Sequence, residues 1–199
     1  MKNKKYTLRQ HLQGVREGMS PQVRAATNAT FVTWITRLGV AGQPEIGPEA
    51  TIAAYVPIGT EPGSVAMLDA LRDQRHRVLL PIVGPGDPSP LSWAGYDGPE
   101  SLTVGRFGLL EPAGAPQPGS VINSADLILV PALAVDRSGN RLGRGAGYYD
   151  RSLQSIDTKR LVAVVYDHEV LDEIPGDALD VPMGWSLTPS GGFHRLGTT

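Results

Sequence analysis

Short aliphatic blocks alternate along this chain with longer amphipathic segments, and residues rich in glycine and proline separate the two kinds. An unbroken aliphatic block is typical of a strand that is buried on both faces of a parallel sheet. The blocks predict strands over residues 51–56, 77–83, 91–96, 127–130, 160–166 and 185–188.

Apolar residues at helical spacing predict the helices, which cover residues 2–18, 21–38, 64–75 and 148–156. Ser20 is placed to cap the second helix and Pro21 to occupy its first position. Strand, helix and strand between residues 51 and 83 form a βαβ unit, and such a unit requires parallel strands.

This order of elements predicts an α/β fold: a single three-layer domain over residues 1–199, with a largely parallel central sheet and helices on both faces. Residues 97–119 show little periodicity and are expected to form an extended loop layer. The C-terminal residues 191–199 are expected to fray.

Composition narrows the class of protein. A length of 199 residues fits one domain, and a net charge of -2 argues against non-specific binding to nucleic acid. The chain has no cysteine, so disulfides and thiolate chemistry are excluded. No apolar run has the length of a membrane span, and the N-terminus lacks the apolar core of a signal peptide. We therefore expect a cytoplasmic protein without a membrane partner. We further expect a monomer that acts on small molecules.

The loop that follows the strand at 127–130 is the strongest candidate for a binding site. Ligands of open α/β sheets bind at the carboxyl ends of the strands. Here Gly143, Gly145 and Gly147 alternate with Arg141 and Arg144 just before a predicted helix, an arrangement that suits an anion. The segment lacks the Lys-Ser/Thr of a P-loop and the glycine spacing of a dinucleotide fingerprint. A glycine-rich turn with solvated arginines is the simpler structural explanation.

Other charged residues have equally simple explanations. Lys5 and Arg9 lie one helical turn apart and face the same way, which also describes an ordinary solvated basic face. Glu61 and Asp150 both stand near predicted helix starts, where a carboxylate is stabilised by the helix dipole alone. The four histidines show no metal-binding spacing.

The segment Gly139–Asp150, GNRLGRGAGYYD, closely resembles the signature of the 5-formyltetrahydrofolate cyclo-ligase family, also called methenyltetrahydrofolate synthetases. Weaker similarity extends from Lys5 to about Thr188. The resemblance implies ATP- and magnesium-dependent cyclisation of 5-formyltetrahydrofolate to 5,10-methenyltetrahydrofolate. ADP and phosphate would be released after phosphorylation of the formyl oxygen.

The resemblance also implies roles for particular residues. It assigns phosphate and ATP contacts to Lys5, Arg9, Arg141, Leu142, Gly143, Arg144, Gly145, Ala146, Gly147, Tyr148 and Tyr149. It assigns folate contacts to Arg9, Val56, Glu61, Arg144, Gly145, Gly147 and Tyr148. Catalysis would depend on Arg144, Lys5 and Asp150, and Asp150 would hold Mg²⁺.

The chain departs from the family pattern at several positions. Ala146 stands where glycine or lysine is usual, and Gly184 stands where relatives often carry a second acidic residue linked to the metal. Two alternatives therefore stay open. One is a different α/β enzyme that acts on a phosphorylated or anionic small molecule, and the other is a non-catalytic protein that binds folate or nucleotide.

Overall fold

The central feature of the computed structural model, which describes residues 2–176 and 179–197, is a seven-stranded sheet. Its strands are β1 (Thr51–Ala53), β2 (Arg77–Ile82), β3 (Ser92–Gly95), β6 (Leu127–Pro131), β9 (Leu161–Val164), β11 (Trp185–Thr188) and β12 (Gly192–Arg195). The spatial order is β12-β11-β9-β6-β1-β2-β3, with parallel pairing from β11 to β2 and antiparallel strands at both edges. The prediction of a largely parallel sheet is confirmed.

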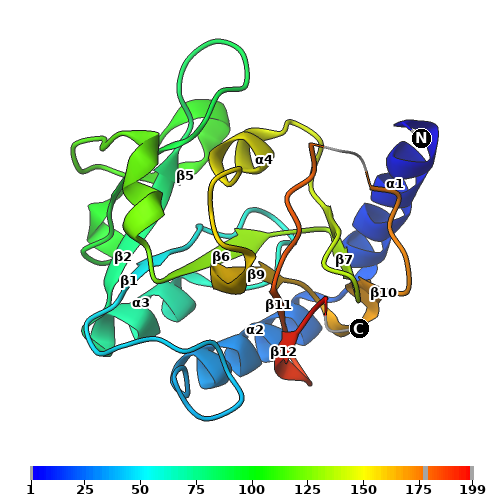
Figure 1. The fold of residues 1–199 in the computed structure, drawn as a ribbon, viewed down its shortest axis with the longest axis horizontal. Coiled ribbons are helices and arrows are strands. Elements are labelled where there is room, and N and C mark those ends of the chain that lie inside the picture. The colour runs from blue at the N-terminus through cyan, green and yellow to red at the C-terminus, as the bar shows by residue number, and fades with distance from the viewer. Residues whose placement is uncertain (1, 177–178, 198–199) are drawn as a thin grey trace.

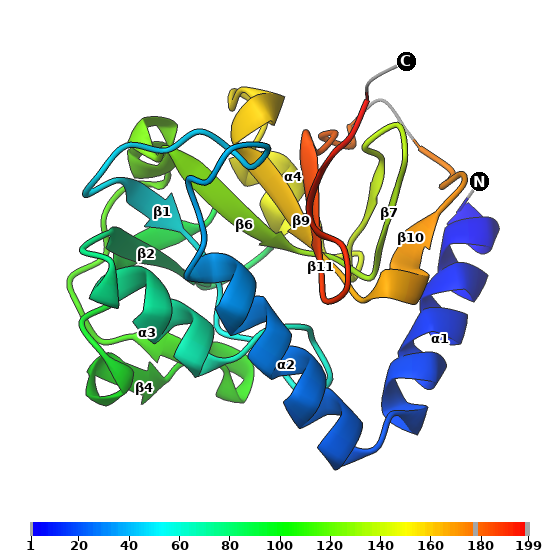
Figure 2. The same cartoon turned by 90° about the horizontal axis from the view of Figure 1, so that it is seen from below.

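Side chains that alternate along the inner strands build two cores. On β6, Leu127 and Leu129 pack on the face covered by α2 (Pro21–Ile35) and α3 (Val65–Asp73), which lie side by side in Figure 2. Ile128 and Val130 pack on the opposite face, toward the 3-10 helix η3 (Gly119–Ser124) and α4 (Tyr148–Ser152). Figure 1 shows the sheet between these layers, as the sequence predicts.

A second, three-stranded sheet lies beside the first, and the sequence did not predict it. It consists of β7 (Ala134–Asp136), β8 (Arg141–Leu142) and β10 (Val170–Leu171), in the order β10-β7-β8. Helix α1 (Lys2–Gly18) covers it, and Leu12 of that helix packs with Leu133 and Leu142. Strands this short hold too few residues to show an alternation in the sequence.

Several sequence expectations need correction. The helix predicted to reach residue 38 ends at Ile35, and the strand predicted over residues 51–56 spans Thr51–Ala53. Residues 97–119 are not a structureless loop layer, because β4 (Leu102–Val104) and β5 (Leu110–Pro112) pair there as an antiparallel hairpin. The helix predicted to reach residue 156 ends at Ser152. The expected frayed end is ordered over β12, because Phe193 joins the core and Gly192 lets the Trp34 ring pack directly against the backbone. Residues 198–199 lie outside the described part of the chain.

Within the described ranges, no helix combines the length and the apolar character that crossing a membrane requires.

Candidate active site

A cavity of about 410 Å³ opens at the carboxyl ends of β1, β2 and β6. The chain passes from β1 to β2 on one side and later returns to place β6 on the other side of β1, so the cavity lies where the strand order reverses. Its walls come from the loops after these strands and from the β4–β5 hairpin. This is the rim that the sequence predicts for a ligand.

Two arginines hold the end of β6. Arg141 donates from Nη1 to the carbonyl of Pro131 (3.1 Å), and Arg16 donates from Nη2 to the carbonyl of Ala132 (2.6 Å). Arg16 also forms a two-point ion pair with Glu169, with Nε–Oε1 at 2.6 Å and Nη2–Oε2 at 2.8 Å. Burial by itself lowers the pKa of Arg16, but the Glu169 carboxylate outweighs that effect and raises it.

The glycine loop forms one wall of the cavity. Gly145 and Gly147 adopt φ of +106° and +76°, a backbone conformation that favours glycine. Among the described residues, none accepts a hydrogen bond from the backbone N–H groups of Arg144 to Gly147. Arg9 braces the loop from α1 by donating from Nε to the Gly143 carbonyl (2.8 Å). Because α4 has five residues, the free amides and the arginines would contribute more to the binding of an anion than a helix dipole would.

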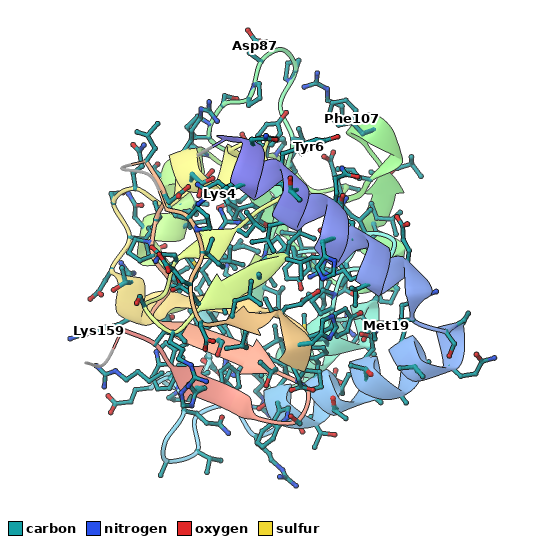
Figure 3. All side chains as sticks on the ribbon, turned by 90° about the vertical axis from the view of Figure 1, so that its right-hand side faces the viewer. Lys4, Tyr6, Met19, Asp87, Phe107 and Lys159 are labelled. Atoms are coloured by element: carbon teal, nitrogen blue, oxygen red, sulfur yellow. The ribbon has the colours of Figure 1, made fainter. Side chains whose placement is uncertain are left out.

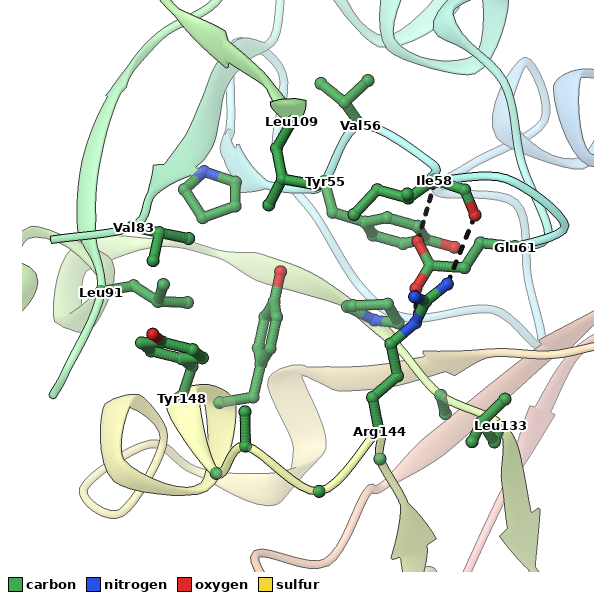
Figure 4. A pocket seen from close by; sticks show the side chains of 18 of the residues that line it. Tyr55, Val56, Ile58, Glu61, Val83, Leu91, Leu109, Leu133, Arg144 and Tyr148 are labelled. Atoms are coloured by element: carbon green, nitrogen blue, oxygen red, sulfur yellow. Dashed lines mark hydrogen bonds and ion pairs between the residues drawn. The ribbon is translucent and has the colours of Figure 1, made fainter. Parts of the chain in front are cut away.

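Glu61 and Arg144 meet across the mouth of the cavity (Figure 4). The carboxylate of Glu61 is buried and lies 2.9 Å from Arg144 Nε, and its other oxygen accepts from the backbone N–H of Ile58 (2.9 Å). The side chain of Arg144 remains 48% exposed, and its Nη2 also lies 3.4 Å from the Ile58 carbonyl oxygen. The resemblance assigns both residues to the folate and Arg144 also to ATP, and the structure joins the two side chains in one ion pair.

Asp150 and Arg141, predicted for magnesium and for phosphate, also form an ion pair, with Arg141 Nη2 at 2.6 Å from Asp150 Oδ1. Arg141 is buried, whereas the Asp150 side chain is 28% exposed and lines the cavity. Tyr149 lines it too, and its buried hydroxyl has no hydrogen-bond partner among the described residues. Burial, together with the nearby Glu61 carboxylate, raises the pKa of Tyr149, so its phenol stays protonated and can donate a hydrogen bond.

Not every predicted residue reaches the cavity. Val56, Gly143, Ala146 and Tyr148 line it. The side chain of Leu142 instead packs in the core under α1. Lys5 does not line the cavity either, and its Nζ lies 2.6 Å from Asp180 Oδ2.

The donor set fits a magnesium ion that is held largely by a nucleotide. Within the described ranges, no three side chains of His, Asp or Glu gather as a metal cluster. Magnesium commonly takes one or two carboxylates and completes its coordination with phosphate oxygens and water, and Asp150 offers one carboxylate at the cavity. An acidic residue at position 184 could not supply a second carboxylate without a rearrangement of the backbone, because its Cβ would lie 2.3 Å from the Thr158 carbonyl oxygen.

Comparison with known proteins gives a consistent result. The sequence model of the 5-formyltetrahydrofolate cyclo-ligase family matches residues 1–189, which is nearly the whole chain. The chain belongs to the 5-formyltetrahydrofolate cyclo-ligase family. The prediction of an enzyme of this family is thereby confirmed.

Individual relatives agree with this cyclo-ligase assignment. A 5-formyltetrahydrofolate cyclo-ligase of Mycolicibacterium smegmatis is 46% identical over 188 residues, which cover 92% of this chain and 89% of the relative. The NMR structure of an Aquifex aeolicus 5,10-methenyltetrahydrofolate synthetase superposes with a TM-score of 0.74 at 30% identity, covering 98% of this chain and 94% of that one. A Mycoplasma pneumoniae 5,10-methenyltetrahydrofolate synthetase, at 20% identity and a TM-score of 0.67, covers 90% and 94% respectively and shares the fold.

Sequence reasoning about this cyclo-ligase missed some residues at the site. Arg16 lines the cavity and Glu169 supports it, yet neither was singled out. A signal was present, because Leu12 and Arg16 are one helical turn apart on the buried side of α1. An arginine that continues an apolar stripe indicates a buried partner. Glu111, a third missed residue, also lines the cavity.

Proposed function

We propose that this protein catalyses the ATP- and magnesium-dependent cyclisation of 5-formyltetrahydrofolate to 5,10-methenyltetrahydrofolate, with release of ADP and phosphate. One observation carries the proposal beyond family membership. One wall of the cavity is a loop with unsatisfied backbone N–H groups, with Arg144 and Asp150 on either side. Another part of the same cavity is an apolar chamber lined by Tyr148, Val83 and Leu91. A polyanion and a planar ring system can therefore bind side by side (Figure 4).

The reaction needs the formyl oxygen to be turned into a leaving group. In the proposed sequence this oxygen attacks the γ-phosphorus of ATP, and the bond from that phosphorus to the ADP oxygen breaks. N10 of the folate then attacks the formyl carbon, and the carbon–oxygen bond breaks with departure of phosphate. The N10 proton goes to solvent. No protein nucleophile is needed, since phosphoryl transfer depends on alignment and charge neutralisation.

The chain supplies these functions through the residues of the rim. The loop amides and Arg144 would bind the terminal phosphates and the charge that develops on them. Arg141 would hold the Asp150 carboxylate in place, as it does through the 2.6 Å contact. Glu61, Val56 and Tyr148 would orient the folate so that N10 faces the activated carbon. On α1, Arg9 fixes the glycine loop through its hydrogen bond to the Gly143 carbonyl. Lys5 lies on the same helix outside the cavity, and it would have to leave its ion pair with Asp180 to contact phosphate.

Magnesium, when bound, supplies charge neutralisation at the transferring phosphoryl group, and Asp150 is the cavity carboxylate that would hold it.

Replacing Arg144 with alanine is expected to raise the KM for ATP about tenfold, the loss of one charge-assisted hydrogen bond to phosphate. The KM for 5-formyltetrahydrofolate should change less. Initial rates, followed by the absorbance of the methenyl product, measure both constants. Arg37→Ala, which removes an exposed arginine outside the cavity, is the matched control. An unchanged KM for ATP and an unchanged rate in Arg144→Ala would remove this residue from the phosphate site.

The product assay, together with measurements of ADP release and of ligand binding, decides between the proposal and its alternatives. An enzyme that uses the loop for another anion would release ADP or phosphate without any dependence on the folate. A non-catalytic binding protein would bind folate or nucleotide tightly in calorimetry and yield no methenyl product.

A further inference from the structure

Glu111 is a carboxylate of the cavity wall to which the reaction scheme above gives no role. It lies on β5 and lines the cavity, and only 8% of the residue's surface is exposed to solvent. Its Oε1 accepts a hydrogen bond from the backbone N–H of Val83 at 2.9 Å, which places the group at the Val83 side of the chamber. Gly105, the residue that follows β4, leaves space for the Glu111 side chain, because a Cβ at this position would lie 2.0 Å from Glu111 Oε2.

The other carboxylates of the cavity are already paired with cations. Glu61 meets Arg144, and Asp150 meets Arg141. Among the residues that the structure describes, no lysine, arginine or histidine forms an ion pair with Glu111, and no group donates a hydrogen bond to its Oε2. A buried carboxylate without a cation is costly unless donors satisfy it. A ligand that offers such donors would therefore be bound favourably at this position.

The surroundings of Glu111 indicate the shape of that ligand. Val83, Leu91 and Leu109 lie on the side of the cavity away from the Glu61–Arg144 pair, and the Tyr148 ring lies beside them (Figure 4). These side chains form an apolar slot suited to a flat ring, with one carboxylate at its wall. The pyrimidine edge of a reduced pterin carries the 2-amino group next to N3–H. That edge is a pair of adjacent donors that a carboxylate accepts well.

We propose that Glu111 recognises the 2-amino group and N3–H of the pterin, as a specificity-determining residue of the folate site. The inference rests on the proposed function and adds the orientation of the substrate. The formyl group on N5 belongs to the other ring of the pterin. With the pyrimidine edge on Glu111, the formyl group is directed toward Arg144 and the glycine loop. The Glu61 carboxylate, which is held by Arg144 at 2.9 Å and by the Ile58 N–H, then contacts the folate away from the pyrimidine edge.

The test removes each half of the interaction in turn. Dissociation constants are measured by calorimetry without ATP, for 5-formyltetrahydrofolate and for its analogue in which hydrogen replaces the 2-amino group. The proteins are wild type, Glu111→Gln, Glu61→Gln and Glu100→Gln. Glutamine at 111 keeps an oxygen for the Val83 N–H but loses the charge, and Glu100 is an exposed glutamate outside the cavity.

We expect wild type, Glu61→Gln and Glu100→Gln to bind the analogue at least about tenfold more weakly than the natural substrate. Glu111→Gln should bind the natural substrate about tenfold more weakly than wild type does, and should no longer distinguish the two ligands. The KM for ATP and the urea midpoint of Glu111→Gln should match wild type, which separates recognition from a purely structural role.

Several outcomes would overturn the assignment. Equal binding of both ligands by wild type would do so without any variant, even if Glu111→Gln failed to fold. Loss of discrimination in Glu61→Gln instead of Glu111→Gln would transfer the role to Glu61. Both results leave the proposed cyclisation intact. By contrast, wild type that binds 5-formyltetrahydrofolate but forms no methenyl product with ATP would refute the proposed function and not the recognition by Glu111.

Discussion

Replacing Asp150 with asparagine is expected to lower kcat at saturating ATP by about 100-fold, the size of effect seen when one transition-state charge contact is lost. Asparagine keeps an oxygen that can accept the hydrogen bond from Arg141 Nη2, now 2.6 Å from Asp150 Oδ1. The geometry of the rim is therefore preserved while the negative charge that would hold magnesium disappears. Binding of 5-formyltetrahydrofolate, measured by calorimetry without ATP, should change far less than turnover.

Asp87→Asn is the matched control, because Asp87 lies on an exposed loop at the outer surface (Figure 3). This control should keep wild-type turnover at every magnesium concentration. Equal turnover of Asp150→Asn and wild type at limiting magnesium would contradict the role given to Asp150. A parallel loss of folate binding would point to a collapsed rim instead.

Replacing Glu169 with alanine is expected to reduce the free energy of unfolding by about 3–5 kcal/mol, the usual cost of breaking a buried ion pair from one side. Glu169 and Arg16 are both almost fully buried, with side-chain exposures of 0% and 1%. The carboxylate also accepts from the backbone N–H of Tyr166 at 2.8 Å. The variant therefore leaves a buried guanidinium and a buried amide without their partner. Urea unfolding monitored by tryptophan fluorescence measures the loss.

Glu173→Ala, which truncates an exposed glutamate, should leave the unfolding curve unchanged. In the double variant Arg16→Met/Glu169→Leu, part of the lost stability should return, since no uncompensated charge remains. A loss below about 1 kcal/mol in Glu169→Ala would show that the pair is no more important than an exposed salt bridge.

The main sheet could be predicted because its signals are local. Leu127, Ile128, Leu129 and Val130 are all fully or almost fully buried, so the strand is uniformly aliphatic. The start of α2 was predicted from Ser20 and Pro21, and the Ser20 hydroxyl does accept from the Val23 N–H. Such features depend on a few residues that are neighbours in the chain, so the sequence alone is enough to predict them.

The smaller sheet and the hairpin depend on contacts between distant residues. Strand β8 has two residues, and it is held by pairing with β7 and by the packing of Leu142 under α1. The turn between β7 and β8 is fixed by the buried Asp136 carboxylate, which accepts from the backbone N–H groups of Asn140 and Ile174. Nothing in the local pattern distinguishes such a carboxylate from a solvated one.

In the candidate site, too, some features could be predicted from local sequence and others depend on contacts between distant residues. The glycine loop and the residues around Glu61 reach one cavity because strand ends in a parallel sheet share an edge, which a sequence can reveal. Which charges neutralise one another is decided by side-chain geometry across the fold. The Glu61–Arg144 and Lys5–Asp180 pairs join residues far apart in the chain. Glu111 was hidden for a similar reason, since its hairpin carries no helical or strand periodicity long enough to read.

Transfer of the formyl oxygen to phosphate is the central claim, and an isotope label tests it most directly. The protein is incubated with ATP, magnesium and 5-formyltetrahydrofolate that carries heavy oxygen in its formyl group. The inorganic phosphate is then analysed by mass spectrometry. The account predicts one labelled phosphate for each methenyltetrahydrofolate formed. Unlabelled phosphate, with the heavy oxygen released into water, would contradict it.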